Sequence, residues 1–426
     1  MMHKTESKPF SLQSIDIELP HINRQKWSNG SSLITMPPVS QEIYFVTWEF
    51  DFDKVQMLTL PNGAVLHKII KEIIGKKTKH YDSQEIKSFF EEKGARFKVS
   101  TTSQSLVLRL SCLAEYWEPC LEKVVEIIND PVLDAKGWKR VQKKLLNRIA
   151  DLNFDTEWEA GQQLKEQLLG DNDFWNARMT SNTVLSVKSE DLVKAYAYIM
   201  NSKGLRIYLG GRWKSADQRS IKKYFSKTND FKLTIESNVK DLAREFKIKP
   251  TKYNGAQFSL RWGRMLMAPK DPSYPIALVA AKALGGYFGS RLMQTLREER
   301  GLTYGAYAFV APYATFTVFE IITDVSKENL ALVEQLISDE LERLGDELIE
   351  DQEWNTIKNN LIGDLLLSLD GPIALINRYR ALDARGLTPI DFTTQVKMIQ
   401  EMKPETVRDF FKKNLKPSIF KKVRVG

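Results

Sequence analysis

Apolar residues recur along this chain with the three-to-four-residue spacing of helices that bury one face against a core. The pattern predicts helices over residues 66–74, 83–93, 276–284, 290–299 and 330–344. Gly94, Gly301 and Gly345 each follow one of these segments, in the position where glycine commonly ends a helix. The helices therefore fall into two groups, one in each part of the chain.

Shorter segments alternate between apolar and polar positions, which is the pattern of half-buried strands. Leu106, Leu108, Leu110 and Cys112 alternate in the first part, and Phe319 and Ile321 belong to the matching strand of the second. Strands joined by hairpins, with helices on one face, predict an α+β fold with mainly antiparallel sheets.

The two groups of elements repeat one another. Trp138 and Trp354 stand in similar helical segments 216 residues apart, and residues 190–209 resemble residues 405–425 at an offset of 215. Chance similarity between amphipathic helices explains one match better than several in the same order. The near-constant offset predicts two homologous domains, over residues 1–213 and 254–426, joined by a Lys-rich linker over 214–253.

Composition narrows the class of protein. The 426 residues are 42% hydrophobic and 27% charged, and 62 Lys and Arg against 54 Asp and Glu give a net charge of +8. The basic excess is small and spread along the chain, and it comes with no nucleic-acid motif, so we expect no nucleic-acid partner.

Location is also constrained by the sequence. Cys112 and Cys120 have neither zinc nor redox-motif spacing, so we expect buried, reduced thiols in a reducing compartment. The N-terminus lacks the apolar core of a signal peptide, and the most apolar helix is too short to span a bilayer. We expect a cytoplasmic protein with no membrane partner, or a periplasmic one if the start was trimmed.

Candidate chemistry is concentrated at one corner. Arg297 and Tyr304 lie seven residues apart, on either side of Gly301, where a helix ends and a strand begins. A guanidinium and a phenol can both donate to a peptide carbonyl or a developing oxyanion. The alternative is structural, with Arg297 paired to Glu298 or Glu320 and the tyrosine simply packed.

Other catalytic signals are weak. Gly285, Gly286 and Gly289 follow a helix and are not followed by a phosphate-binding lysine, which favours a tight turn over a phosphate loop. Ser290 and Ser368 have no histidine suited to a triad and no surrounding nucleophile motif.

Residues 274–304 resemble the insulinase/pitrilysin family of zinc peptidases, which includes the mitochondrial processing peptidases and small bacterial two-domain members. The resemblance rests on a Gly-Gly turn, a Ser-Arg-Leu helix start and a Leu-Arg…Gly-Leu-x-Tyr ending, and the repeat extends it to most of the chain. It implies that Arg297 and Tyr304 reach toward a zinc site on another domain. There they would hold the substrate backbone and stabilise the tetrahedral intermediate.

The family's zinc site is an inverted H-x-x-E-H on the first helix of the active domain, completed by a Glu on a later helix. One register places His67, Ile70 and Lys71 at the motif positions. The other register, aligned from residues 83–86, places Lys68, Lys71 and Glu72 there. Neither register keeps two histidines and a glutamate.

The rest of the ligand set is also absent. The later helix has Asn147 and Arg148 where the distal glutamate ligand is expected. The four histidines are His3, His21, His67 and His80, and no two of them have metal-ligand spacing. We therefore expect no metal and no other cofactor in this chain, with zinc in a partner subunit.

These observations together predict the zinc-free subunit of a heterodimeric metallopeptidase that acts on peptides or unfolded polypeptide. Its partner would be a zinc-bearing homologous subunit, with the peptide adding a strand to a sheet edge, in the partner's active domain. The alternative is a non-enzymatic peptide-binding or scaffold protein on the same fold, perhaps a homodimer. An independent metallopeptidase would require zinc in the isolated protein.

Overall fold

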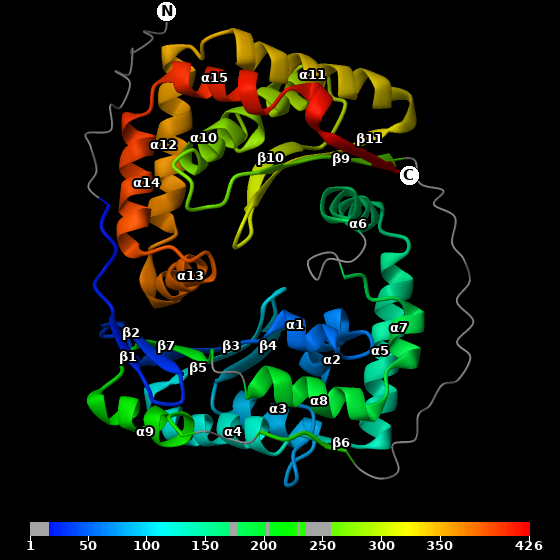
Figure 1. Ribbon diagram of the computed structural model, residues 1–426. Helices are drawn as coiled ribbons and strands as arrows, with labels where there is room; N and C mark the ends of the chain where they lie inside the picture. Colours follow the sequence, from blue (N-terminus) through cyan, green and yellow to red (C-terminus); the bar gives the residue numbers. More distant parts are fainter. Residues whose placement is uncertain (1–16, 171–176, 202–203, 228–230, 236–256) are drawn as a thin grey trace, which may run out of the picture.

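The computed structural model describes residues 17–170, 177–201, 204–227, 231–235 and 257–426, which form two halves that face each other (Figure 1). In the first half the described residues form a six-stranded sheet in the order β1-β2-β7-β3-β5-β4. Its strands are β1 (Asn23–Lys26), β2 (Ser32–Pro38), β3 (Ile43–Asp51), β4 (Arg96–Thr101), β5 (Ser105–Leu113) and β7 (Arg206–Gly211). In the second half, the order is β10-β11-β9-β12. These strands are β9 (Gln257–Leu266), β10 (Ala306–Pro312), β11 (Thr317–Ser326) and β12 (Lys421–Val425).

Helices cover one face of each sheet. The first half contains α1 (Lys54–Leu58), α2 (Gly63–Ile73), α3 (Ser83–Glu92), α4 (Trp117–Asn129), α5 (Ala135–Leu152), α6 (Thr156–Leu169), α7 (Ser181–Ser186), α8 (Ser189–Met200) and α9 (Ser215–Phe225). The second half contains α10 (Tyr274–Gly285), the π-helical turn η3 (Met293–Glu298), α11 (Leu330–Asp346), α12 (Asp351–Leu367), α13 (Gly371–Ala384), α14 (Pro389–Glu401) and α15 (Pro404–Asn414).

The two sheets share a four-stranded pattern. The order β4-β5-β3-β7 in the first half corresponds to β10-β11-β9-β12 in the second. Trp48 on β3 and Trp262 on β9 occupy matching places, each fully buried and each lying between two antiparallel neighbours. This confirms the predicted α+β fold of two homologous units. The six-stranded and four-stranded sheets are antiparallel except for the β2–β7 pair, which is parallel. A separate short pair, β6 (Val132–Leu133) with β8 (Thr234–Ile235), is also parallel.

One helix from each half packs on the sheet of the other half. Helix α6 leaves the first half and packs on β9 and β12, where Leu164 lies against Val423 and Val425. Helix α13 leaves the second half and packs on β2, β3 and β7, with Ile376 and Tyr379 in an apolar cluster on that sheet. The helices start at Thr156 and Gly371, 215 residues apart, so they are equivalent elements of the repeat. Helices were expected on one face of each sheet. Because α6 and α13 each pack on the sheet of the opposite half, part of the other face is covered as well.

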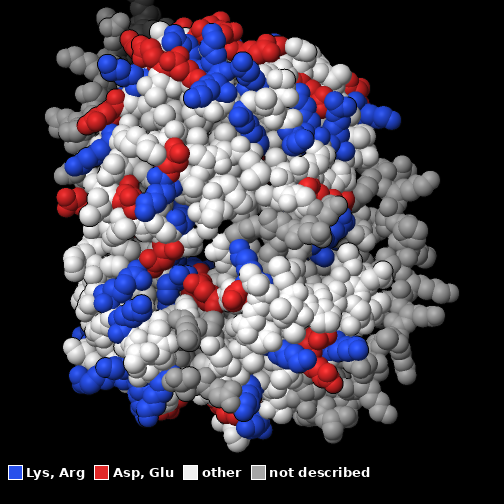
Figure 2. All heavy atoms as spheres, viewed as in Figure 1, with Lys and Arg blue, Asp and Glu red and all other residues white. Residues whose placement is uncertain are grey.

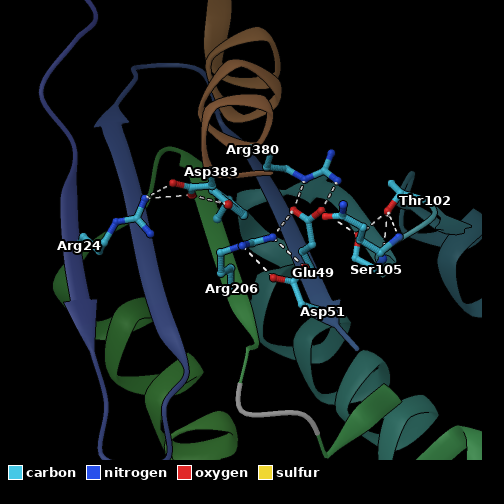
Figure 3. Close-up of polar contacts among 10 residues, drawn as sticks. Arg24, Glu49, Asp51, Thr102, Ser105, Arg206, Arg380 and Asp383 are labelled. Carbon is cyan, nitrogen blue, oxygen red and sulfur yellow. Dashed lines mark hydrogen bonds and ion pairs between the residues drawn. The ribbon is translucent and has the colours of Figure 1, made fainter. Parts of the chain in front are cut away.

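A buried ion network fastens α13 to the first sheet (Figure 3). Arg380 donates from Nε to Glu49 Oε2 at 2.9 Å and from Nη2 to Glu49 Oε1 at 3.1 Å, and only 4% of the Glu49 side chain is exposed. The Tyr208 hydroxyl donates to Asp383 at 2.6 Å, and Arg24 binds the same carboxylate. Because buried charges are costly without partners, this network fixes how the two halves meet.

Three expectations need adjustment. Part of the expected linker belongs to the first half, because Ile221 and Phe225 of α9, together with Phe231 and Leu233, lie in that half's core. Residues 236–253 lie outside the described residues, so the domain boundaries stay a prediction. Gly345 does not end its helix: α11 continues to Asp346, and Gly345 is buried against the backbone of α15.

The third adjustment concerns residues 290–299, where an ordinary helix was expected. Only the first residues are α-helical, and Met293–Glu298 form a π-helical turn. The backbone N–H of Glu299 reaches back five residues to the carbonyl of Gln294 at 3.0 Å. Turns of this kind insert an extra residue into a helix and occur frequently at functional sites.

Charged side chains of both signs lie on the surface of the protein. On the face shown in Figure 2, basic and acidic side chains are interspersed over both halves. None of the described helices combines the length and the apolar character needed to cross a bilayer.

Candidate functional site

The Arg297–Tyr304 corner is built by the π-helical turn and the glycine that follows it. Gly301 has a φ of +61°, which glycine adopts without steric cost. The N–H of Leu302 donates to the carbonyl of Leu296 at 2.8 Å, closing the end of the helix. The chain then turns toward β10, as the sequence predicted.

Thr303 anchors the loop that presents Tyr304. Its hydroxyl lies 2.8 Å from the carbonyl oxygen of Asp324 and 3.0 Å from that of Gly305, and it accepts from the N–H of Gly305 at 3.2 Å. Tyr304 itself is 86% exposed. The backbone of this loop is therefore fixed by hydrogen bonds, while the Tyr304 side chain is exposed. The sequence did not single out Thr303.

Arg297 is also accessible. Its side chain is 40% exposed, lies 3.5 Å from the Glu298 carboxylate, and stacks over Phe288 at 5.2 Å from guanidinium carbon to ring centre. The contact with Glu298 is an exposed ion pair between chain neighbours, and such pairs contribute little to stability. Part of the Arg297 guanidinium is therefore exposed to solvent.

The helix where the zinc motif would lie is α2. His67 is 2% exposed and packs in the core, with its ring 5.3 Å from that of Phe52. Burial, reinforced by the nearby positive charges of Lys68 and Lys71, lowers the pKa of His67 to about 3. His67 is therefore a neutral core residue. Of the other histidines, His21 and His80 are exposed, and His3 lies outside the described residues.

The second register of the motif places lysines at the site. The Lys68 ammonium donates to the carbonyl of Ala177 at 2.7 Å. Burial lowers its pKa to about 8, with further contributions from the positive charges of Lys165, Lys71 and Arg148. A dication would be repelled by this cluster.

Glu72 is the one carboxylate among Lys68, Lys71 and Glu72, and it is already paired with lysine side chains. Lys144 of α5 binds it at 2.6 Å, and Lys71 lies 3.4 Å away. Burial alone would raise the pKa of Glu72, but the Lys144 hydrogen bond and charge outweigh it, so the pKa falls below its usual value. Zinc in proteins takes Cys, His and carboxylate ligands, so Lys68, Lys71 and Glu72 do not fit this metal. Over the described residues, no group of three His, Cys, Asp or Glu side chains is arranged to hold a metal ion.

Comparison with known proteins decides the family. A model described as "Insulinase (Peptidase family M16)" matches residues 67–185, and one described as "Peptidase M16 inactive domain" matches residues 186–361. Together they span more than half of the chain. The chain belongs to the insulinase (M16) family. The resemblance inferred from residues 274–304 is thereby confirmed.

Individual M16 relatives agree with this assignment. A Helicobacter pylori protein named "Non-peptidase homolog YmxG" is 24% identical over 372 residues, which is 82% of each chain. The crystal structure of a "peptidase M16 inactive domain" from Pseudomonas fluorescens has a TM-score of 0.77 at 20% identity and covers 95% of this chain and 97% of its own. The structure of a protease from Helicobacter pylori has a TM-score of 0.80 at 14% identity, over 95% and 99%. At these identities the two structures establish the fold.

Proposed function

We propose that this chain is the zinc-free subunit of a heterodimeric M16 metallopeptidase, and that it supplies Arg297 and Tyr304 to the active site of a zinc-bearing homologous subunit. One contrast carries the proposal. Tyr304 is 86% exposed on an anchored backbone, whereas the motif positions of α2 hold two lysines and a carboxylate bound by lysine. The described residues thus contain an exposed pair of donors and no group of side chains arranged to hold a metal ion.

Arg297 and Tyr304 have distinct roles in this proposal. The Arg297 guanidinium binds substrate carbonyl oxygens and holds the peptide in place. The Tyr304 hydroxyl donates to the oxyanion that develops on the scissile carbonyl, where loss of one donor typically costs about a hundredfold in rate. Substrates are peptides or unfolded segments, because an exposed backbone is what both groups recognise. We place the assembly in the cytoplasm, since Cys112 and Cys120 are both buried free thiols.

Reconstitution tests the proposal. The purified chain should hydrolyse no peptide and bind no zinc, while the mixture with its zinc-bearing homologue should form a 1:1 complex that hydrolyses peptides. Metal analysis should find the zinc with the partner. Stoichiometric zinc and peptidase activity in the isolated chain would overturn the proposal.

A second function is a scaffold or peptide-binding protein without any catalytic partner. The "non-peptidase" name of the Helicobacter pylori relative favours it. In that case the chain should self-associate or bind peptide alone, and no M16 homologue should become active on mixing.

A further inference from the structure

A pocket of about 360 Å³ lies between α2, α3, β6 and α5 in the first half. Helix α5 begins beside β6, at the end of this half that faces away from the second half (Figure 1). Among the described residues that line the pocket, none comes from β4 or from the Arg297–Tyr304 corner. Its volume is near the lower end of the range of about 300–1,000 Å³ that is usual for ligand pockets. The pocket can therefore hold a small molecule, and it is separate from the candidate site.

One wall of the pocket is apolar. Ile73 of α2 and Val141 of α5 line it, together with Val132 and Leu133 of β6. All four side chains are largely buried, so the surface that they present to the pocket is held in place by the core. A ligand that covers this wall removes apolar surface from water, which favours binding. The wall suits a ligand with an apolar body.

The rest of the pocket is basic. Five of its lining residues are cations: Lys76, Lys77, Lys136, Arg140 and Lys144. Lys77 binds Asp134 at 2.7 Å, and Lys144 binds Glu72 at 2.6 Å. The side chains of the other three cations form no salt bridge with any residue in the described part of the chain. Three positive charges of the pocket are thus without a paired carboxylate.

The remaining carboxylate of the pocket, Asp82, is held by the backbone. It caps α3 and accepts from the N–H of Glu85 at 2.9 Å. The pKa of Asp82 lies below its usual value, first because of the Glu85 N–H and also because of the charges of Arg140 and Lys136. Both cations therefore act on the same side of the pocket, although neither forms an ion pair there.

We propose that this pocket binds an organic phosphate monoester with a small apolar body. The phosphate group contacts Lys76, Lys136 and Arg140, and the apolar body lies against the wall formed by α2, β6 and α5. This site goes beyond the proposed peptidase role, and it requires no partner subunit.

A phosphate group fits these cations better than a carboxylate does. At neutral pH a phosphate monoester carries about −1.5 to −2 charges and three terminal oxygens, whereas a carboxylate has one charge and two oxygens. The Arg140 guanidinium can bind two of the phosphate oxygens through parallel hydrogen bonds. The Ser83 hydroxyl also lines the pocket and forms no hydrogen bond with another described residue, so it supplies a further donor.

Isothermal titration calorimetry of the purified full chain tests the proposal, with phenyl phosphate as the probe. Inorganic phosphate lacks the apolar body, benzoate carries a carboxylate in place of the phosphate, and benzyl alcohol carries no charge. Phenyl phosphate should bind about tenfold or more tightly than inorganic phosphate, because the apolar wall removes its ring from water. It should also bind more tightly than benzoate, and benzyl alcohol should show no measurable binding.

Charge reversal tests whether the named cations hold the phosphate. The Lys136→Glu/Arg140→Glu variant should weaken phenyl phosphate binding about tenfold or more, because two attractions become repulsions. The matched control is Lys139→Glu/Lys143→Glu, which makes the same change in net charge at the same spacing on the same helix, at residues that do not line the pocket. All four side chains are exposed, so both variants should fold, and the control should bind as the wild-type protein does.

Equal losses in the two variants would overturn the proposal, because they would mean that the overall charge of α5 attracts the ligand. Equal binding of phenyl phosphate and inorganic phosphate would exclude a role for the apolar wall, and equal binding of benzoate would exclude selection for phosphate. Either result, or no binding of phenyl phosphate, would also overturn the proposal. None of these measurements uses the zinc-bearing subunit, so their outcome is independent of reconstitution.

Discussion

The two halves place different side chains at the same backbone corner. In the first half Gly94, at a φ of +57°, separates α3 from β4, and in the second half Gly301, at +61°, separates η3 from β10. Four residues before Gly94 is Phe90, which is 5% exposed and stacks on Phe97. Four residues before Gly301 is Arg297, whose side chain is 40% exposed.

The connection to the strand differs as well. Strand β4 begins two residues after Gly94, whereas β10 begins five residues after Gly301, and Tyr304 lies in the additional length. One corner thus serves the core and the other presents donors to the outside. A repeated fold keeps the glycine that the backbone requires, while side chains at equivalent places are free to change role.

The comparison predicts that truncating Phe90 lowers the free energy of unfolding much more than truncating Tyr304 does. Phe90→Ala should destabilise the protein by about 3–5 kcal/mol, because it removes a buried ring and leaves a cavity. Tyr304→Ala should change stability by no more than about 0.5 kcal/mol, as is usual for exposed positions. Urea unfolding followed by circular dichroism measures both, and similar losses in the two variants would show that Tyr304 is a packing residue.

The contact between the halves can be tested in the same way. Glu49→Ala should cost about 3–5 kcal/mol, because it leaves the buried Arg380 without its counter-charge. Arg24→Ala removes the exposed end of the same network, where the side chain is 41% accessible, and should cost less than about 1 kcal/mol. Equal effects, measured by urea unfolding at neutral pH, would mean that burial does not decide the strength of this network.

His67 supplies a smaller, pH-dependent effect. Its folded pKa of about 3 lies below the ordinary value of 6.5, so the unfolded chain takes up the proton first as the pH falls. The free energy of unfolding therefore falls as the pH drops below about 6.5. The loss due to His67 is about 2 kcal/mol between pH 7 and pH 5.

The His67→Gln variant should flatten this dependence, while the exposed-residue control His80→Gln should keep it. Unfolding free energies across this pH range provide the measurement. If zinc raised the stability of the wild-type protein but not of His67→Gln, His67 would be a ligand and its interpretation as a core residue would be wrong.

Local pattern was enough to predict much of this molecule. Apolar spacing located α2, α3, α10 and α11, and the repeat of Trp138 and Trp354 indicated two equivalent units. The glycine positions 94 and 301 were expected from helix-end chemistry alone. These features depend on residues close together in the chain, where spacing carries the information.

Long-range pairing was not predictable in this way. Glu49 and Arg380 are 331 residues apart, and nothing in either local segment indicates their contact. The exchange of α6 and α13 depends on which sheet each helix meets, not on its own periodicity. At the candidate site, Arg297 and Tyr304 were visible in the sequence, whereas the π-helical turn and the Thr303 anchor emerged only from the backbone.

The most direct test of the account is the turnover of the reconstituted pair carrying Tyr304→Phe. This change removes one hydroxyl from a highly exposed side chain, so the fold and the assembly with the zinc-bearing subunit should be preserved. The account predicts that kcat falls about a hundredfold or more, with little change in KM, because the lost hydrogen bond forms in the transition state. Unchanged kcat in a fully assembled complex would contradict it.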